Sequence, residues 1–185
     1  MILDAGLIFT GGTTYGAGTL AIGQALTTTA NSTNIIDLAG PNLPPSQTTP
    51  SAQPFRDLGI GDDPALKLLV QCLTTFTTGT SLIVNLQGSP DNGSGAPSGF
   101  VTWWSSPTYA LATLVAGARL LDMDMPRPPA NVPEPRFLQL SFTISGTMAT
   151  ATILAAIVLD RYDQVYNASV NSISGGYPAG ITVAN

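Results

Sequence analysis

Charge and histidine are what this sequence most lacks. Charged residues make up 9% of its 185 residues, against roughly 25% in an average soluble protein. Histidine is absent altogether, which excludes a Ser-His-Asp or Cys-His catalytic arrangement and an imidazole metal site. The formal net charge is −5, and Lys67 is the single lysine. A chain of this charge cannot neutralise a run of phosphates, so nucleic acid and anionic membrane surfaces are disfavoured as partners.

Cysteine and long apolar runs are also scarce. The one cysteine, Cys72, lies in an apolar stretch, so we expect a buried thiol and no intramolecular disulfide. The longest apolar run, 153–159, is far shorter than the roughly 20 residues of a membrane-spanning helix. The first residues, MILDAGLIF, contain no basic side chain, so we expect no signal peptide. No metal or other cofactor is implied by any motif.

Hydrophobic residues, in contrast, make up 44% of the chain, and 19 glycines and 15 prolines divide it into short segments. A fraction this high argues for a folded protein despite the low charge. About eight segments are typical of strands, which predicts an antiparallel sandwich or barrel. Residues 109–117 predict one short helical turn, ended by Gly117. A poorly charged surface suits a protein that is packed against neighbours rather than a solitary monomer.

Three parts of the chain differ in composition. We expect residues 24–166 to form the folded body. Residues 1–23 and 167–185 contain Gly-rich stretches with scattered Tyr, Leu and Ile, and we interpret them as arms that become ordered on another surface. Tyr177 in the C-terminal arm is an interface candidate.

Two β-hairpins are predicted, one over 66–87 and one over 136–160. In the first strand of the second hairpin, Leu138 to Ile144 alternate with polar residues, whereas its second strand is apolar on both faces. The outer face of that strand should therefore be covered, by an arm of the chain or by a neighbouring subunit. We expect that contact at Thr152, Leu154, Ala156 and Val158, or, in the reversed register, at Ile153, Ile157 and Leu159.

Few residues suggest chemistry. Asp122 and Asp124 share one face of a predicted strand, and we interpret them as an exposed flank whose neighbours Leu121, Met123 and Met125 pack inward. Asp57, Asp62 and Asp63 lie in a Gly-rich turn whose spacing does not match a calcium-binding loop.

Trp103 and Trp104 are adjacent on a predicted strand. We therefore expect one of them to face the core and the other to face outward or an interface.

The order of the segments resembles the jelly-roll capsid cement (decoration) proteins of tailed bacteriophages, the family typified by the cement protein of a Bordetella phage. The matching stretches are MILD at 1–4 with Phe9, STNIIDL at 32–38, DLGIGDD at 57–63 leading into ALKLLVQ, SLIVNLQ at 81–87, SSP at 105–107, LVAGARL at 114–120 and RFLQLSFTISGT at 136–147. The stretch 11–23, the loop 40–55 and the tail after Tyr166 are additions to the family's pattern.

The resemblance implies an all-β, eight-stranded antiparallel jelly-roll sandwich. It also implies a virion protein without enzymatic activity or cofactor, made in the bacterial host cytoplasm and bound to the outer surface of the major capsid protein shell. There it would join capsomers and stabilise the head, as a homodimer or homotrimer. The alternative is a carbohydrate-binding jelly roll on the virion surface, which would attach to host glycans through an outward tryptophan, Tyr109 and Asp side chains. A hydrolase that uses Asp122 and Asp124 is a third hypothesis, which no further acid or base motif supports.

Overall fold

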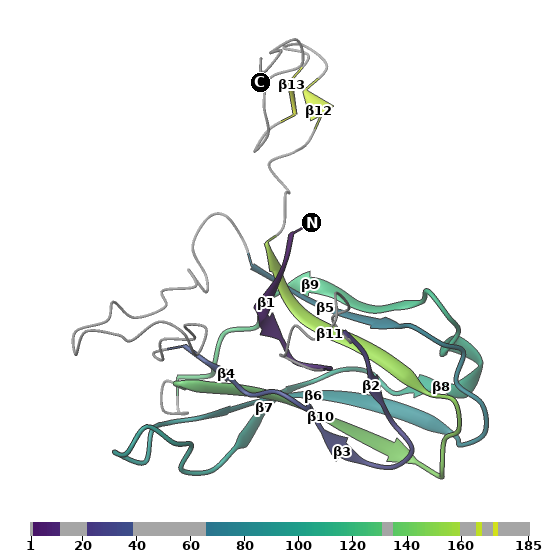
Figure 1. The fold of residues 1–185 in the computed structure, drawn as a ribbon, viewed down its shortest axis with the longest axis horizontal. Coiled ribbons are helices and arrows are strands. Elements are labelled where there is room, and N and C mark those ends of the chain that lie inside the picture. The colour runs from purple at the N-terminus through teal and green to yellow at the C-terminus, as the bar shows by residue number, and fades with distance from the viewer. Residues whose placement is uncertain are drawn as a thin grey trace, which may run out of the picture.

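The computed structural model describes residues 2–11, 22–38, 66–130 and 135–159, together with two short strands at 166–167 and 172–173. Two antiparallel sheets pack face to face (Figure 1). The first sheet has the order β1(Ile2–Ile8), β11(Thr152–Leu159), β5(Leu66–Cys72) and β9(Arg119–Asp124), with β2(Gln24–Ala25) also paired to β11. The second has the order β3(Ala30–Asn31), β10(Phe137–Ser145), β6(Ser81–Ser89) and β7(Val101–Ser105), with β4(Ile36–Asp37) on β10 and β8(Tyr109–Ala110) on β6. β12(Tyr166–Asn167) and β13(Ser172–Ile173) pair with each other.

The strand pairs are nested along the chain. β1 pairs with β11, β3 and β4 pair with β10, β5 pairs with β9, and β6 pairs with β7. Nested antiparallel pairs divided between two sheets are the arrangement of a jelly roll. The predicted all-β antiparallel sandwich is therefore confirmed. The strands are more fragmented than the predicted eight, because residues 24–37 form three two-residue strands.

Both predicted hairpins are wrong, although their strands are present. β5 lies in the first sheet and β6 in the second, and β11 and β10 are divided in the same way. The connections 73–80 and 146–151 thus cross from one sheet to the other. The physical reason is that each strand buries its apolar face against the opposite sheet, so two such strands can face each other across the core as well as lie side by side.

The core lies between the two sheets. Leu138, Leu140 and Phe142 of β10 are fully buried and point inward, and Ile153 and Ile157 of β11 are fully buried in the same cluster. Each such side chain contributes about 1.5–3 kcal/mol by leaving water. The alternation in β10 is the pattern from which its inward face was predicted.

The first residues of the predicted N-terminal arm belong to the sandwich. β1 pairs with β11 at Ile2–Leu159 and Leu3–Val158. Ile8 is 3% exposed and Phe9 is fully buried in the core. The boundary predicted at residue 23 therefore does not fit residues 2–11. The predicted helical turn is present as a 3-10 turn, η1(Leu111–Thr113), and Gly117 follows it with a φ of +84°.

Candidate assembly surfaces

The outer face of β11 carries four of the interface candidates. Leu154, Ala156 and Val158 are 7%, 0% and 3% exposed, and Thr152 is half-buried. The three buried side chains form a second apolar cluster with Ile8 and Leu69, outside the main core, and half-buried Ile22 and Leu73 pack against it. In the alternative set, Ile153 and Ile157 lie in the main core and not on the outer face of β11. The first of the two predicted registers is therefore the one in the structure.

Residues from the predicted N-terminal arm form part of this cluster. Ile8 and Ile22 both belong to 1–23, and Gly23 lies so close to β11 that a Cβ atom there would come within 2.7 Å of both Thr152 and Leu73 side-chain atoms. Thr10 Oγ1 accepts a hydrogen bond from Ala155 N at 2.9 Å and donates one to Ile22 O at 3.0 Å. The apolar outer side of β11 is thus packed at least in part by its own chain.

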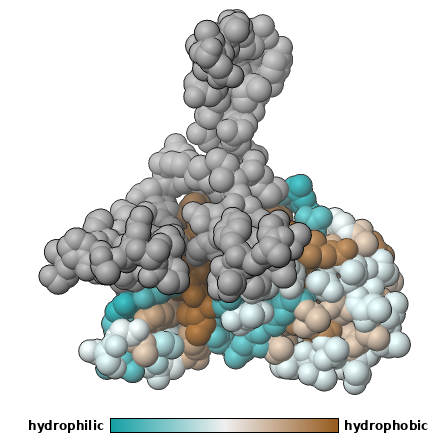
Figure 2. Space-filling view, viewed as in Figure 1, coloured by the Kyte–Doolittle hydropathy of each residue, from teal (hydrophilic) through white to brown (hydrophobic). Residues whose placement is uncertain are grey.

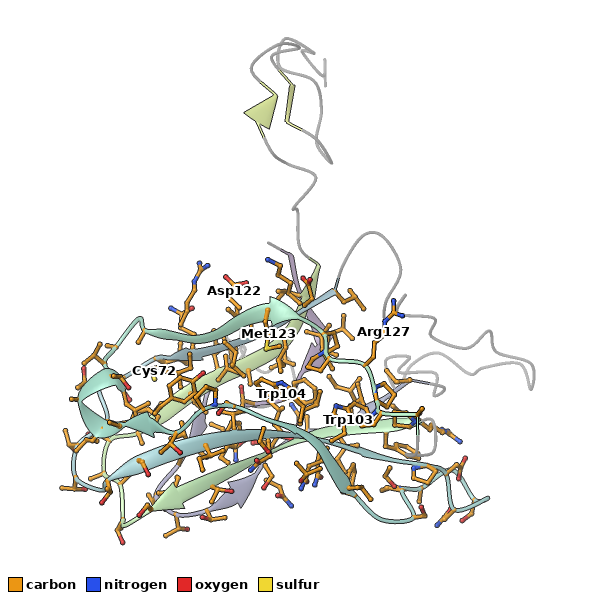
Figure 3. The ribbon with its side chains drawn as sticks, turned by 180° about the vertical axis from the view of Figure 1, so that it is seen from behind. Cys72, Trp103, Trp104, Asp122, Met123 and Arg127 are labelled. Carbon is orange, nitrogen blue, oxygen red and sulfur yellow. The ribbon has the colours of Figure 1, made fainter. Side chains whose placement is uncertain are left out.

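Trp103 and Trp104 do not point to opposite sides, which corrects the prediction of one outward tryptophan. The register between β6 and β7 shifts by one residue, because Leu86 pairs with Trp104 whereas Gln87 pairs with Thr102. A bulge of this kind turns neighbouring side chains toward the same face. Both tryptophans are half-buried and pack against the core, and Figure 3 shows them on the inner side of the second sheet.

Trp103 fills a close-packed site. A Cβ atom on Gly88 would lie 2.3 Å from the Trp103 ring and 2.7 Å from Pro135 Cβ. The indole Nε1 of Trp103 is buried and has no hydrogen-bond acceptor among the described residues. Leaving such a donor unpaired costs about 1–3 kcal/mol. Trp103 is therefore a packing residue with an unsatisfied N–H group.

Tyr109 is also directed inward. Its half-buried side chain packs against the core, and its hydroxyl donates a hydrogen bond of 2.6 Å to Leu120 O. Burial raises the pKa of Tyr109 above its usual value, and a hydrogen bond with Ser106 opposes this effect. The aromatic side chains assigned to sugar stacking are thus occupied in packing.

Asp122 and Asp124 lie as predicted on the exposed side of β9, while Leu121 and Met125 are buried and Met123 is half-buried (Figure 3). Asp122 accepts a hydrogen bond of 3.0 Å from Arg119 and lies 3.9 Å from Lys67 Nζ. Among the described residues, no three acidic or thiol side chains gather as they would around a metal ion. Asp57, Asp62, Asp63 and Tyr177 lie outside the described residues.

Cys72 is fully buried, as predicted, and burial raises the pKa of its thiol to about 11. A thiol with so high a pKa is almost wholly protonated at neutral pH and is therefore a poor nucleophile.

Sequence reasoning missed an ionic cluster around Arg136. Its guanidinium donates to Asp37 through Nε at 2.9 Å and Nη2 at 3.0 Å, and Nη1 donates to Asp91. These residues are distant in sequence, and Asp37 and Asp91 are isolated charges in uncharged stretches. Arg136 lies directly before the uncharged β10, and no pattern in the sequence pairs it with the two carboxylates.

The outer face of β6, β7 and β10 is mostly polar and has no charged residue. Gln139 Nε2 donates to Gln87 Oε1 at 2.7 Å, and Gln87 Nε2 donates to Thr102 Oγ1 at 2.9 Å. In the next row, Asn85 Nδ2 donates to Thr143 Oγ1 at 3.0 Å and Asn85 Oδ1 accepts from Ser105 Oγ at 2.7 Å. The predicted polar face of β10 thus continues across β6 and β7 as rows of hydrogen-bonded amides and hydroxyls.

A family model covers most of the sandwich. The Bbp16 model matches residues 20–158, from just before β2 to the end of β11. The chain belongs to the Bbp16 family. Bbp16 is the Bordetella phage capsid protein family, so this member is a phage structural protein and a virion component. No curated protein matches the chain. The described part contains no helix with the length and hydropathy needed to cross a membrane.

Proposed function

We propose that this Bbp16-family protein is a capsid cement protein. It binds the outer surface of the major capsid protein shell, joins adjacent capsomers and so stabilises the phage head. The observation that carries this proposal is the family match over 20–158, which covers the jelly-roll sandwich apart from β1 rather than an isolated motif. The role assigned is structural, with no catalytic step and no cofactor.

The charge distribution supports an assembly role. Strands β6, β7 and β10 contain no charged residue, and neither do the connections 73–80 and 146–151. Large protein–protein interfaces are depleted of charge at their centres, because buried charges must lose their hydration. One modest interface repeated around a symmetric shell holds strongly through avidity. A protein of this kind does not need one very tight contact.

A non-enzymatic role agrees with the side chains present. The chain has no histidine, its one thiol is buried and mostly protonated, and Asp122 is engaged with Arg119 and Lys67. The proposed partners are the major capsid protein and further copies of this chain, in a homodimer or homotrimer. The carbohydrate-binding alternative is weaker than the sequence suggested, because Trp103, Trp104 and Tyr109 all pack against the core.

Co-sedimentation tests the binding directly. Phage heads made without this protein are incubated with increasing amounts of the purified chain and pelleted. We expect saturable binding at a fixed ratio to the major capsid protein. Pellets that contain no more of the chain than a control without heads would refute the cement function.

A further inference from the structure

Four connections gather at one end of the sandwich. We call their exposed residues the threonine-rich end, and they belong to the segments 27–29, 74–80, 110–117 and 146–150. Figure 1 shows this end, which bears β8, opposite the end that bears β4. The connections are tied to one another. Thr77 and Ala149 exchange two backbone hydrogen bonds of 3.0 and 2.7 Å, Met148 N donates to Thr27 O at 2.9 Å, and Phe76 N donates to Leu114 O at 2.9 Å.

The threonine-rich end carries no charge. Its four segments contain no Asp, Glu, Lys or Arg, in a chain whose net charge is −5. The described charged side chains lie instead on β5 and β9, in the Arg136 cluster and at Arg127. In Figure 2 the end that bears β8 is coloured mostly pale to tan, as hydroxyl-bearing and small apolar residues are. This end is therefore a surface, like the outer face of β6, β7 and β10, where a net-negative chain can approach a large partner at low electrostatic and desolvation cost.

The threonine-rich end is also held in one conformation. Thr78 and Thr150 have φ values of +58° and +51°, which β-branched residues seldom adopt. Side-chain hydrogen bonds hold both of them, since Thr78 Oγ1 donates to Thr147 O at 2.8 Å and the Thr77 and Thr150 hydroxyls lie 2.8 Å apart. Strained backbone of this kind persists where several surrounding contacts hold it in place, and it is concentrated at functional surfaces. A surface ordered in advance loses little entropy on binding.

The side chains exposed there indicate the class of partner. Ala110, Ala112, Val115 and Ala116 are exposed beside the threonines, and Val115 is 46% exposed. The aromatic residues nearby are turned inward, because Phe76 is 3% exposed and Tyr109 is half-buried. Sugar rings stack on exposed aromatic faces, and phosphates need cations, so neither suits this surface. Hydroxyls and small apolar groups suit an uncharged protein surface.

We propose that the threonine-rich end is the surface that docks on the protein shell of the phage head. This inference rests on the proposed cement function and assigns it to particular residues. The end offers fewer exposed residues than the roughly 20–30 a side of a standard stable complex. That size fits a contact repeated over a shell better than it fits an isolated dimer.

Charge insertion tests the assignment. Thr28→Glu and Ala112→Glu each place a carboxylate at an exposed position of the threonine-rich end, and Val101→Glu is the matched control on β7 at a site that is 50% exposed. Each variant is titrated onto heads made without this protein. We expect Thr28→Glu and Ala112→Glu to bind roughly tenfold more weakly or worse, because the new charge must lose its hydration. Val101→Glu should bind as the unmodified chain does, and all three should keep its melting temperature and mass.

Thiol protection gives a second measurement that does not depend on charge. Cys72 is the only cysteine and is buried, so an Ala112→Cys or Val101→Cys variant has one accessible thiol. We expect binding to heads to protect the thiol of the Ala112→Cys variant from a maleimide and to leave that of the Val101→Cys variant reactive.

Three results would overturn the inference in different ways. Unchanged binding of Thr28→Glu and Ala112→Glu would place the docking surface elsewhere and leave the cement function intact. A fall in the mass of these two variants, with binding to heads retained, would make the threonine-rich end a contact between copies of the chain. Failure of the unmodified chain to bind heads would refute the cement function itself.

Discussion

Arg136 donates two parallel hydrogen bonds to Asp37, from Nε to Oδ1 at 2.9 Å and from Nη2 to Oδ2 at 3.0 Å, across 99 residues of sequence. The same guanidinium donates to Asp91 through Nη1 and lies 4.9 Å from the centre of the Phe137 ring. Asp91 Oδ1 in turn accepts hydrogen bonds from Gly93 N at 2.8 Å and Gly95 N at 3.0 Å. One side chain at the start of β10 therefore connects β4 with the connection between β6 and β7.

Replacing Arg136 by lysine should loosen this junction. An ammonium group cannot make the two parallel hydrogen bonds to Asp37 while it also reaches Asp91. We expect Arg136→Lys to lower the urea midpoint and to speed amide hydrogen exchange at residues 91–98. Arg119→Lys is the control, because the Arg119 side chain is 53% exposed and its pair with Asp122 is solvated. Equal midpoints for the two variants would show that the junction adds nothing to stability.

The Asp91 carboxylate should make stability depend on pH in a defined range. Burial raises the pKa of Asp91, but hydrogen bonds from Gly93 N, Gly95 N and Arg136 outweigh it, so its pKa lies below the ordinary 3.8. A lowered pKa in the folded state stabilises the fold above the unfolded-state pKa, and this contribution is lost as the pH falls through the folded-state pKa.

An Asp91→Asn variant keeps an oxygen that can accept from the two glycines but loses the charge. The difference in melting temperature between the unmodified chain and Asp91→Asn should be constant from pH 7 to about 5 and shrink below about 3.8. A difference that grows on acidification would contradict the lowered pKa.

Trp103 should be replaceable by another aromatic residue but not by a small one. Its buried Nε1 has no acceptor among the described residues, so Trp103→Phe removes an unsatisfied donor worth about 1–3 kcal/mol together with some packing area. We expect the free energy of unfolding of Trp103→Phe to stay within about 1 kcal/mol of the original or to rise. Trp103→Ala should lose about 2–4 kcal/mol by leaving a void over Gly88 and Pro135. A loss from Trp103→Phe well above about 1 kcal/mol would mean that the indole N–H has a hydrogen-bond partner.

Leu154 tests whether the outer face of β11 is packed by its own chain. Leu154 is 7% exposed and lies in a cluster with Ile8, Leu69 and Val158. Leu154→Ala should lower the free energy of unfolding by about 2–4 kcal/mol. The loss should be the same at every protein concentration, because the contacts are intramolecular. If it appears only at concentrations at which the chain self-associates, a second copy covers this face instead.

The strands could be predicted from the sequence better than their partners could. The alternation in Leu138 to Ile144 identified the inward face of β10, and the uniformly apolar β11 correctly indicated that both of its faces are packed. Periodicity reports which side of a strand is buried, but it does not report whether the next strand lies beside it or across the core. That is why the sequence predicts hairpins of β5 with β6 and of β10 with β11, although the strands of each pair lie in opposite sheets.

The wrong prediction that Trp103 and Trp104 lie on opposite faces has a local cause. A strict period of two sends Trp103 and Trp104 to opposite faces, and the one-residue shift between β6 and β7 removes that alternation. The bulge leaves no clear mark in the sequence.

The Arg136 cluster and the threonine-rich end were not predictable for a related reason. Each is assembled from segments far apart in the sequence, such as Asp37 with Arg136 and Thr77 with Ala149. Only the tertiary fold brings them together.

The temperature at which phage heads release their DNA tests the central claim most directly. Heads made without this protein are compared with the same heads after the purified chain has been added back, using a DNA-binding dye during slow heating. The cement function predicts that heads without the protein release DNA at a lower temperature, and that adding the chain back restores the original temperature. Equal release temperatures with and without the bound protein would contradict the claim that it stabilises the head.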